Sequence, residues 1–382
     1  MKLISIFGAF LVLFTSCQQK SKDLSKVLYN QTKELDKISI NISIDDQSLT
    51  SYSFISTYPK EDNKEYLYAY NRLTHSIDKF NIDNKTVSHI SLATEGKDGV
   101  LKNISGLCVS NPDSIWIYSQ ENLYLINSIG KVTNSFKLPI PEGGFIMIDK
   151  NFSRSTSTFY YHPARNSIFY LAVTPNKDRT KYNICEYSIL TDNLKSFEIE
   201  GNSIENKAGT NFGWKQMPNV TFTDKYIIYN YPISSNIYYI DIKTGKKNTV
   251  DGQSKYTKNL VSELTMPYDF QKADKHLLEN VHFFEVIYSP KENVYYRLHL
   301  DKIASYSKNK EFNEQYESKN IYLTILDSNF HIINEQQLSP KTYNYFNGWG
   351  ITKKGLLIFI ENILDTSKNP DILQMDIFCT NP

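Results

Sequence analysis

Two tryptophans that follow glycine are the residues best suited to ligand chemistry in this sequence. Trp214 ends the stretch Phe212-Gly-Trp214, and Trp349 ends the similar stretch Phe346-Asn-Gly-Trp349. An aromatic ring beside glycine can stack on a sugar ring, and nearby amide, imidazole or guanidinium groups can fix the sugar by hydrogen bonds. The candidate ligand-binding residues are therefore Trp214, Trp349, Asn347, Tyr161, His162 and Arg72.

Packing is the alternative role for both tryptophans. Each lies at the entry to a predicted strand, and a motif that nearly repeats at equivalent positions is typical of residues that pack between repeated units. In that case Trp214 and Trp349 would fill seams between sheets and contact no ligand.

Catalytic signatures are absent from the sequence. It contains no HExxH, GxSxG or GxGxxG motif and no P-loop, and its seven histidines follow no metal-binding spacing. No catalytic residue, metal ligand or cofactor is predicted on these grounds. Acidic pairs in loops, such as Glu95 with Asp98, could bind calcium, but loop carboxylates are more often only solvated.

The N-terminus has the features of an export signal. Lys2 supplies a positive charge, and residues 3–14 form an apolar run, shorter than the ~20 helical residues that span a bilayer. The run leads into Thr15-Ser16-Cys17, which resembles a bacterial lipoprotein signal whose cysteine is lipidated. Phe14 departs from that pattern, because leucine is usual three residues before the cysteine. A cleaved signal with an incidental Cys17 is the alternative.

Residues 18–36 have the polar composition of a tether. The resemblance implies an outer-membrane lipoprotein, because no Asp follows Cys17 directly, and the periplasmic side, because no acidic cluster follows it. The expected organisation is a signal peptide over 1–17, a tether over 18–36 and one folded domain over 37–382, held at the membrane by its lipid.

Three further cysteines, Cys108, Cys185 and Cys379, lie at unrelated positions. An odd number in an exported protein predicts at least one free thiol. Burial as small apolar side chains is the expected role of all three.

The composition favours strands over helices. The chain has 28 Tyr and 21 Phe, which are strand formers, and its formal net charge is only +1. Without a basic stripe, nucleic acid is not an expected partner. We expect a monomer.

The arrangement of strands and turns recurs along the chain. In YIIYNYPISSNIYYIDIKTGKKNTV (226–250), an apolar strand, a turn, a second strand, a Gly-containing turn and a polar strand follow one another. Blocks of this kind predict an all-β, six-bladed β-propeller, in which each blade is a four-stranded sheet. Uneven spacing leaves five or seven blades as alternative counts. The predicted blades span residues 52–92, 104–138, 158–199, 220–250, 283–338 and 348–378.

The last predicted blade has only three strands before the chain ends. Residues 37–44, KISINISI, alternate apolar and polar side chains and have no other partner. We expect this N-terminal strand to complete the last blade and close the ring, because an open edge would expose unpaired backbone groups.

The long loops are predicted to gather on one face of the ring. They connect the second to the third strand of a blade, or one blade to the next, and both kinds emerge on the same side. The longest, 251–282, contains a possible short helix over 272–280. Long loops on a rigid scaffold commonly carry function, so this face is expected to bind and the other to be plain.

The lipoprotein-like Cys17 signal, the strand pattern and the missing last strand together resemble uncharacterised six-bladed propeller lipoproteins of Gram-negative bacteria, with a fold like the Tol-system propeller. This resemblance covers residues 37–382 and implies fold and location, not ligand. The expected function is a non-catalytic binding or scaffold module for a protein or glycan. The alternative is a metal-dependent enzyme: propellers of the lactonase type hold a divalent metal with Glu and Asn side chains, for which Glu285, Asn219 and Asn347 are the candidates.

Overall fold

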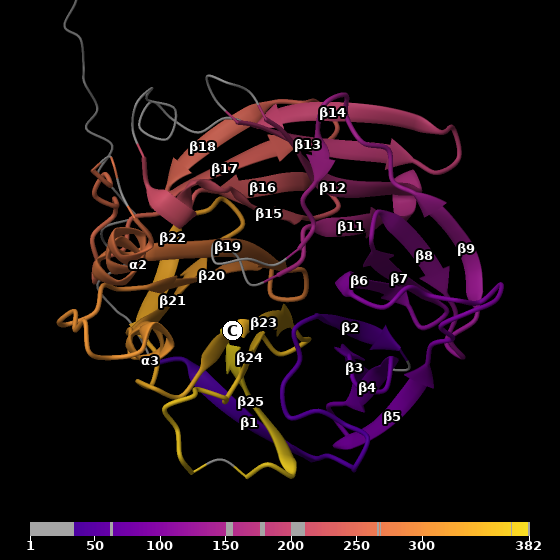
Figure 1. Cartoon of the computed structure of the whole chain (residues 1–382), viewed down its shortest axis with the longest axis horizontal. Coiled ribbons are helices and arrows are strands. Elements are labelled where there is room, and N and C mark those ends of the chain that lie inside the picture. Colours follow the sequence, from indigo (N-terminus) through magenta and orange to yellow (C-terminus); the bar gives the residue numbers. More distant parts are fainter. Residues whose placement is uncertain are drawn as a thin grey trace, which may run out of the picture.

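The computed structural model describes residues 34–61, 64–149, 156–175, 180–199, 211–265, 267, 269–367 and 369–380. The predicted signal peptide, which ends at Cys17, and most of the predicted tether lie outside the described residues. Six sheets surround a central axis, with β1 and β23–β25 forming one of them (Figure 1). The chain is a six-bladed β-propeller, which confirms the predicted fold.

Each blade is named by its order along the chain, and its strands run from the axis outwards. Blade one contains β2 (Ile55–Glu61), β3 (Lys64–Asn71), β4 (Ser76–Asn81) and β5 (Thr86–Ser91). Blade two contains β6 (Ile104–Asn111), β7 (Ser114–Ser119), β8 (Asn122–Ile126) and β9 (Val132–Lys137). Blade three contains β10 (Phe145–Ile146), β11 (Phe159–His162), β12 (Ser167–Thr174), β13 (Lys181–Ser188) and β14 (Asn193–Ile199).

The remaining blades follow the same order. Blade four contains β15 (Asn219–Phe222), β16 (Tyr226–Asn230), β17 (Asn236–Asp241) and β18 (Lys247–Asp251). Blade five contains β19 (His282–Ser289), β20 (Val294–Leu300), β21 (Ile321–Leu326) and β22 (Ile332–Gln337). Blade six contains β23 (Asn344–Ile351), β24 (Leu356–Phe359), β25 (Ile372–Cys379) and β1 (Asp36–Ser43). The helices are η1 (Pro163–Arg165), η2 (Gly213–Gln216), α2 (Phe270–Glu279) and α3 (Phe312–Glu317).

Burial of the strands follows their place in a blade. Every residue of the inner strands β20 and β21 is buried, because each blade packs against neighbours on both faces. The outermost strand β18 alternates exposed and half-buried residues instead. This difference explains why inner strands read as continuous apolar runs and outer strands as alternating ones.

The ring closes through β1, as predicted. All eight residues of β1 pair with β25, from Asp36 opposite Cys379 to Ser43 opposite Ile372. Ile40 and Ile42 point inwards and pack in one cluster with residues of blades one and six, including Leu67 and Phe80 of blade one. The N-terminal strand thus joins the first blade to the last.

Buried carboxylates reinforce both sides of this closure. On blade six, Asp376 accepts hydrogen bonds from Ser39 Oγ (2.6 Å) and Tyr343 Oη (2.7 Å), and Lys37 Nζ lies 3.1 Å away. On blade one, Asp78 accepts a hydrogen bond from Tyr52 Oη at 2.6 Å. The two tyrosines each precede the first strand of their blade and tie it to that blade's third strand.

An imidazole links Asp78 to the residues that follow β1. His89 Nδ1 lies 2.8 Å from Asp78 Oδ1, and His89 Nε2 lies 2.9 Å from Asp45 Oδ2. Burial disfavours the charged imidazole, but the two carboxylates outweigh it and raise the pKa of His89. The hydrogen bond from His89 is the main reason why the pKa of Asp45 is lowered to about 2.

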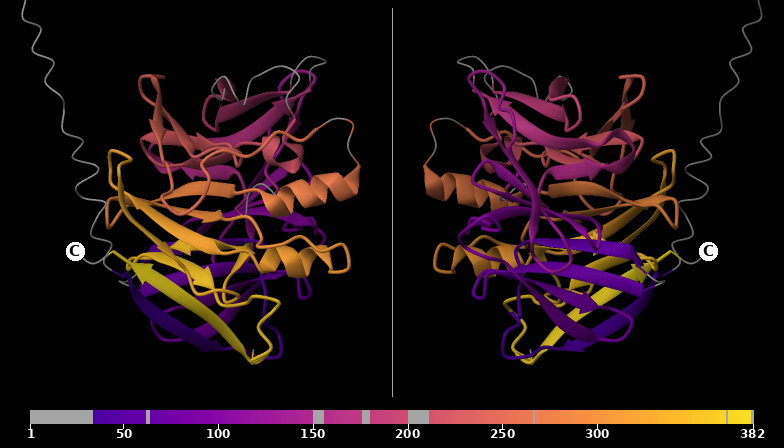
Figure 2. Two further views of the ribbon diagram at one scale, coloured as in Figure 1. Left: turned by 90° about the vertical axis from the view of Figure 1, so that its left-hand side faces the viewer. Right: turned by 90° about the vertical axis from the view of Figure 1, so that its right-hand side faces the viewer.

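The two faces of the ring differ. Connections between the second and third strands of a blade, and between blades, emerge on one side, here called the loop-rich face; it carries η2, α2 and α3. The remaining turns form the plain face, where β1 begins and β25 ends. Figure 2 shows α2 and α3 protruding on one side of the ring and the C-terminus on the other.

Deleting residues 37–44 should open the ring and abolish cooperative unfolding. The deletion removes the β25 partner and four isoleucines, two of them buried, whose burial contributes about 5 kcal/mol, comparable with the whole stability of a domain. Urea unfolding followed by tryptophan fluorescence measures this. Deletion of residues 18–33 is the matched control and should leave the transition unchanged. An unchanged cooperative transition without 37–44 would disprove closure by β1.

Candidate functional site

The largest described insertion on the loop-rich face joins blade four to blade five through α2. Asp269 caps this helix by accepting a hydrogen bond from Lys272 N at 2.8 Å, and Ala273, His276 and Leu277 form its buried side. The sequence predicted a helix over 272–280, so its presence is confirmed and it begins two residues earlier. Burial of one side holds α2 against the ring.

Buried charged side chains fix the beginning of this insertion. Arg297 of β20 donates from Nη1 to Ser235 O (2.8 Å) and from Nη2 to Gly252 O, and its guanidinium lies 4.8 Å from the ring centre of Phe283. A side chain at Gly252 would collide with Arg297, so glycine is required there. Glu335, which is fully buried, accepts a hydrogen bond from Lys255 N at 3.0 Å.

Two buried lysines fix the end of the insertion. Lys319 Nζ donates to Leu277 O (2.9 Å) and Asn280 O (2.8 Å), while Lys215 Nζ donates to Asn280 O (3.2 Å) and Val281 O (2.5 Å). Backbone carbonyls at a helix C-terminus carry partial negative charge and attract ammonium groups. Burial nevertheless lowers the pKa of Lys319 to about 7 and that of Lys215 well below its usual range.

The second insertion, within blade five, contains α3, which the sequence analysis did not predict. Phe312 and Tyr316, one turn apart, stack with ring centres 5.6 Å apart, and this pair is the signal that could have revealed the helix. Gln315 donates to Ser307 O at 2.9 Å and ties the preceding loop to α3. This second insertion contacts the first, because α3 lies against α2.

A segment of blade three reaches across the central channel. The innermost position of this blade is shared by β10 and β11, which both pair with β12, and the chain leaves the sheet between them. On its return, Thr156 N donates to Glu285 Oε1 of blade five at 2.8 Å. Glu285 lies within a bulge of β19 and is buried. Its carboxylate therefore connects two non-adjacent blades.

Exposed apolar side chains gather on the loop-rich face. Eight of the ten large apolar side chains that are exposed in the described residues lie there, and this set comprises Leu73, Leu101, Ile140, Phe145, Tyr256, Leu260, Phe270 and Ile363. Phe270, at the start of α2, is 77% exposed. Long ordered loops that carry exposed apolar side chains make this face the candidate surface for contact with other molecules.

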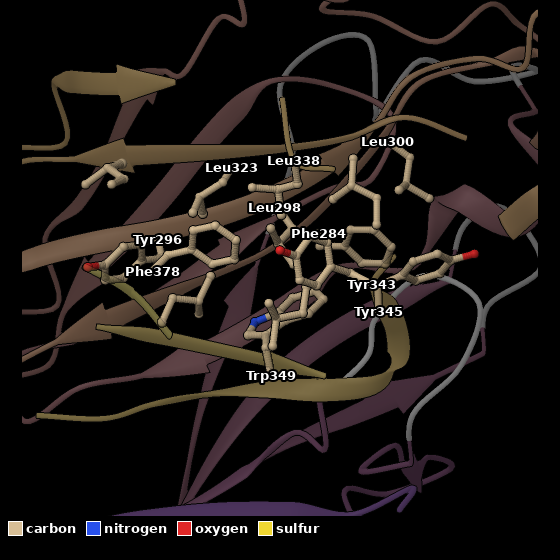
Figure 3. Close-up of a cluster of buried hydrophobic side chains, with 14 of the residues drawn as sticks. Phe284, Tyr296, Leu298, Leu300, Leu323, Leu338, Tyr343, Tyr345, Trp349 and Phe378 are labelled. Atoms are coloured by element: carbon tan, nitrogen blue, oxygen red, sulfur yellow. The ribbon is translucent and has the colours of Figure 1, made fainter. Parts of the chain in front are cut away.

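The predicted tryptophans do not form a shared platform in the described structure. Trp349 is buried, with its ring centre 5.2 Å from that of Phe284, in the cluster that joins blades five and six (Figure 3). This geometry gives Trp349 the packing role that the sequence left as an alternative. Trp214 lies in η2 and Asn347 in β23, but their side chains lie outside what the structure describes.

The other predicted ligand-binding residues do not meet in one place. Two of them lie on the plain face, and the third lies on the loop-rich face. Tyr161 and His162 end β11 at the plain face. The ring of Tyr161 is tilted against that of Trp116, with ring centres 4.9 Å apart, and His162 Nε2 contacts Asp224 O at 3.0 Å. Arg72 is exposed in a loop of blade one on the loop-rich face. A ligand-binding role for these residues remains a prediction without a common site.

Two of the candidate metal ligands, Glu285 and Asn219, each form a hydrogen bond with a backbone atom. Besides the bond from Thr156 to Glu285, Asn219 Nδ2 donates to Phe283 O at 3.0 Å. No group of three or more His, Cys, Asp and Glu side chains in the described residues is placed to hold a metal ion. Cys108, Cys185 and Cys379 are free thiols, and burial raises the pKa of Cys108 and Cys185 to about 11. No helix of the described residues has both the length and the hydrophobicity to cross a bilayer.

Replacing Lys319 with Met should change how stability depends on pH. Because the folded pKa of Lys319, about 7, lies below the unfolded value of 10.5, the unfolded chain binds more protons between them, and stability rises with pH there. Each pH unit adds about 1.4 kcal/mol per such group. Chemical unfolding at pH 7.5 and 9 should therefore show a smaller gain for Lys319→Met than for wild type. The exposed Lys308→Met is the control, and equal gains in all three proteins would contradict the assignment.

The comparisons with known proteins agree with the fold. Residues 33–337 match a family model described as a domain of unknown function, DUF4221. A crystal structure of a DUF4221 member from Bacteroides vulgatus superposes with a TM-score of 0.73 at 18% identity, covering 91% of this chain and 99% of that one. A putative exported protein from Bacteroides fragilis gives a TM-score of 0.52 at 12% identity, covering 92% and 98%. No curated protein sequence matches the chain. Since the family model matches most of its length, the chain belongs to the DUF4221 family.

Proposed function

We propose that this protein is an exported, envelope-anchored binding module that holds a partner on its loop-rich face and performs no catalysis itself. This proposal rests on one observation: the chain end and the ordered insertions lie on opposite faces of the ring. The chain enters the ring at the plain face, and the ordered insertions with their exposed apolar side chains lie opposite.

The orientation follows from the register of β1. Asp36, its first residue, pairs with Cys379 at the plain face, so the chain enters the ring from that side. With Cys17 lipidated in the outer membrane, the plain face would lie towards the bilayer and the loop-rich face towards the periplasm. The fold similarity to a protein named as a putative exported protein fits this location.

Preorganisation of the insertions supports a binding role. Arg297, Glu335, Lys215 and Lys319 hold both ends of the α2 insertion through buried hydrogen bonds. A surface that is ordered before binding loses less conformational entropy in the complex. This favours a platform for recognition.

A protein is the favoured partner, and a glycan is the second candidate. Exposed Leu73, Phe270 and Ile363 offer dispersed apolar contacts that suit a protein surface. Glycan binding would need an exposed aromatic platform, and Trp349 is buried against Phe284. Tyr256, which is 45% exposed, is one ring that remains accessible to a sugar on this face.

Cys17→Ala should abolish lipid attachment. Cells fed a radiolabelled or alkyne-bearing fatty acid should label the wild type, which should sediment with membranes, while Cys17→Ala should be unlabelled and leave the membrane fraction. Cys108→Ala keeps the same number of cysteines as Cys17→Ala and should behave as wild type. Equal labelling of Cys17→Ala would refute the anchor.

Crosslinking should distinguish the two faces. A photoreactive amino acid at Leu73 or Phe270 of the full chain should give adducts in cells, whereas the same group at Thr133, exposed on the rim of blade two, should give none. Adducts that proteases remove indicate a protein partner, and adducts that glycosidases remove indicate a glycan. Equal yields at all three positions would contradict a partner on the loop-rich face.

A further inference from the structure

Two apolar side chains project from turns of the plain face. Ile129 is 68% exposed and Leu190 is 79% exposed, and both lie between the third and fourth strands of neighbouring blades, two and three. Turn tips ordinarily carry polar residues or glycine, because their side chains stay in water.

The backbone holds both tips outward. Asn127 Oδ1 accepts hydrogen bonds from Ile129 N (3.2 Å) and Lys131 N (2.9 Å), and Asp113 Oδ1 accepts one from Ser128 N at 3.1 Å. In blade three, Ile189 N donates to Asn166 O at 3.1 Å, and Tyr187 Oη donates to Asp192 Oδ1 at 2.8 Å. The apolar tips are therefore presented by ordered turns.

Basic residues outnumber acidic ones in the described turns of this face. The described turns of the plain face hold nine Lys or Arg residues: Lys85, Lys131, Arg165, Lys225, Lys243, Lys246, Lys291, Lys353 and Lys354. They hold six acidic residues: Asp83, Asp113, Asp192, Asp224, Glu292 and Asp327. The described loops of the opposite face carry more acidic than basic residues.

The acidic residues of the plain face are engaged within the fold. Asp113 binds Ser128, Asp192 binds Tyr187, and Asp224 accepts a hydrogen bond from Tyr160 Oη at 2.8 Å. In contrast, Lys131, Lys243 and Lys246 are exposed and form no ion pair with another described residue. In the described turns of blades two to four, five basic residues stand against three acidic ones, so the net charge in front of these blades is positive.

A cavity lies beside Leu190. Its volume is about 360 Å³, and its lining includes Arg165, Ser188 and Lys195. Arg165 Nε donates to Glu186 Oε1 at 2.6 Å, which orients the guanidinium at the cavity wall. The carboxylate of Glu186 also lines the cavity, so the recess presents two cations, one carboxylate and several hydroxyl groups.

We propose that the plain face docks on a bilayer that contains anionic phospholipids. Ile129 and Leu190 enter the headgroup region, and Lys131, Lys243 and Lys246 contact lipid phosphates. This inference rests on the proposed function in one respect, because the anchor places the plain face towards the membrane. Blade three lies opposite blade six around the ring, so docking and tether act at opposite sides of the face.

The test uses unlipidated protein that begins at residue 18, so the lipid cannot contribute. All strands lie between Asp36 and Cys379, so the complete ring is retained. Flotation with phosphatidylcholine vesicles, with or without phosphatidylglycerol, should show at least about tenfold stronger binding to the anionic vesicles, since each lysine near the surface contributes about fivefold. Added salt should weaken the binding.

Two variants locate the contact. Ile129→Ser with Leu190→Ser should weaken binding at least about fivefold, and Lys243→Glu with Lys246→Glu at least about tenfold. Leu73→Ser with Phe270→Ser, at equally exposed sites on the loop-rich face, should leave it unchanged. Melting temperatures of all variants should match wild type, because the substituted side chains are exposed.

Three results would overturn the proposal: no binding to either vesicle, equal binding to both, or equal loss in the loop-rich control. Such a failure would leave fatty-acid labelling of Cys17 intact, so the anchor and the docking surface are tested separately. If the wild-type protein took up no fatty-acid label but the unlipidated protein still bound anionic vesicles, only the anchor would be overturned.

Discussion

Pairing of β1 with β25 is the interaction on which the rest of the structure depends. A ring of sheets stays open until a strand from one end of the chain joins the blade formed by the other end. Here the eight residues of β1 provide that link by pairing with β25. The seam is apolar at Ile40 and Ile42, and buried Asp376 and Asp78 lie on either side of it. The place where the ring would open first therefore combines apolar burial with a network of charged and hydroxyl groups.

This network makes the closure sensitive to pH in a defined direction. His89 has a raised pKa, so its contribution is complete below the usual value of 6.5 and is lost as the pH rises through the folded value. Asp45 has a pKa lowered to about 2, so its contribution is present above 3.8 and is lost as the pH falls through 2. The link from Asp45 through His89 to Asp78 is consequently strongest in mildly acidic solution.

The sequence predicts repeated local features well and contacts between distant segments poorly. Alternation in KISINISI was enough to predict β1 and its partner, because no other blade lacked a strand. β10 was missed because two residues give no period, and α3 was missed because its single aromatic pair lies in a polar loop. No local pattern indicates that Thr156 binds Glu285, 129 positions away, or that Lys319 and Lys215 meet at the end of α2. The similarity of the two tryptophan motifs indicated a packing role, and the ring of Trp349 does pack in the seam between two blades.

Rigidity of the closed ring connects its two faces. A single lipid anchor at one end of the chain does not by itself fix the orientation of the domain that it holds. If the plain face docks through Ile129 and Leu190, the ring transmits that orientation to the loop-rich face, because the same six sheets carry the turns of both faces. Phe270 and its neighbours would then point away from the bilayer before a partner arrives. Part of the rotational entropy that association costs would already have been lost, and a modest apolar surface could bind its partner more tightly than the same surface on a freely rotating domain.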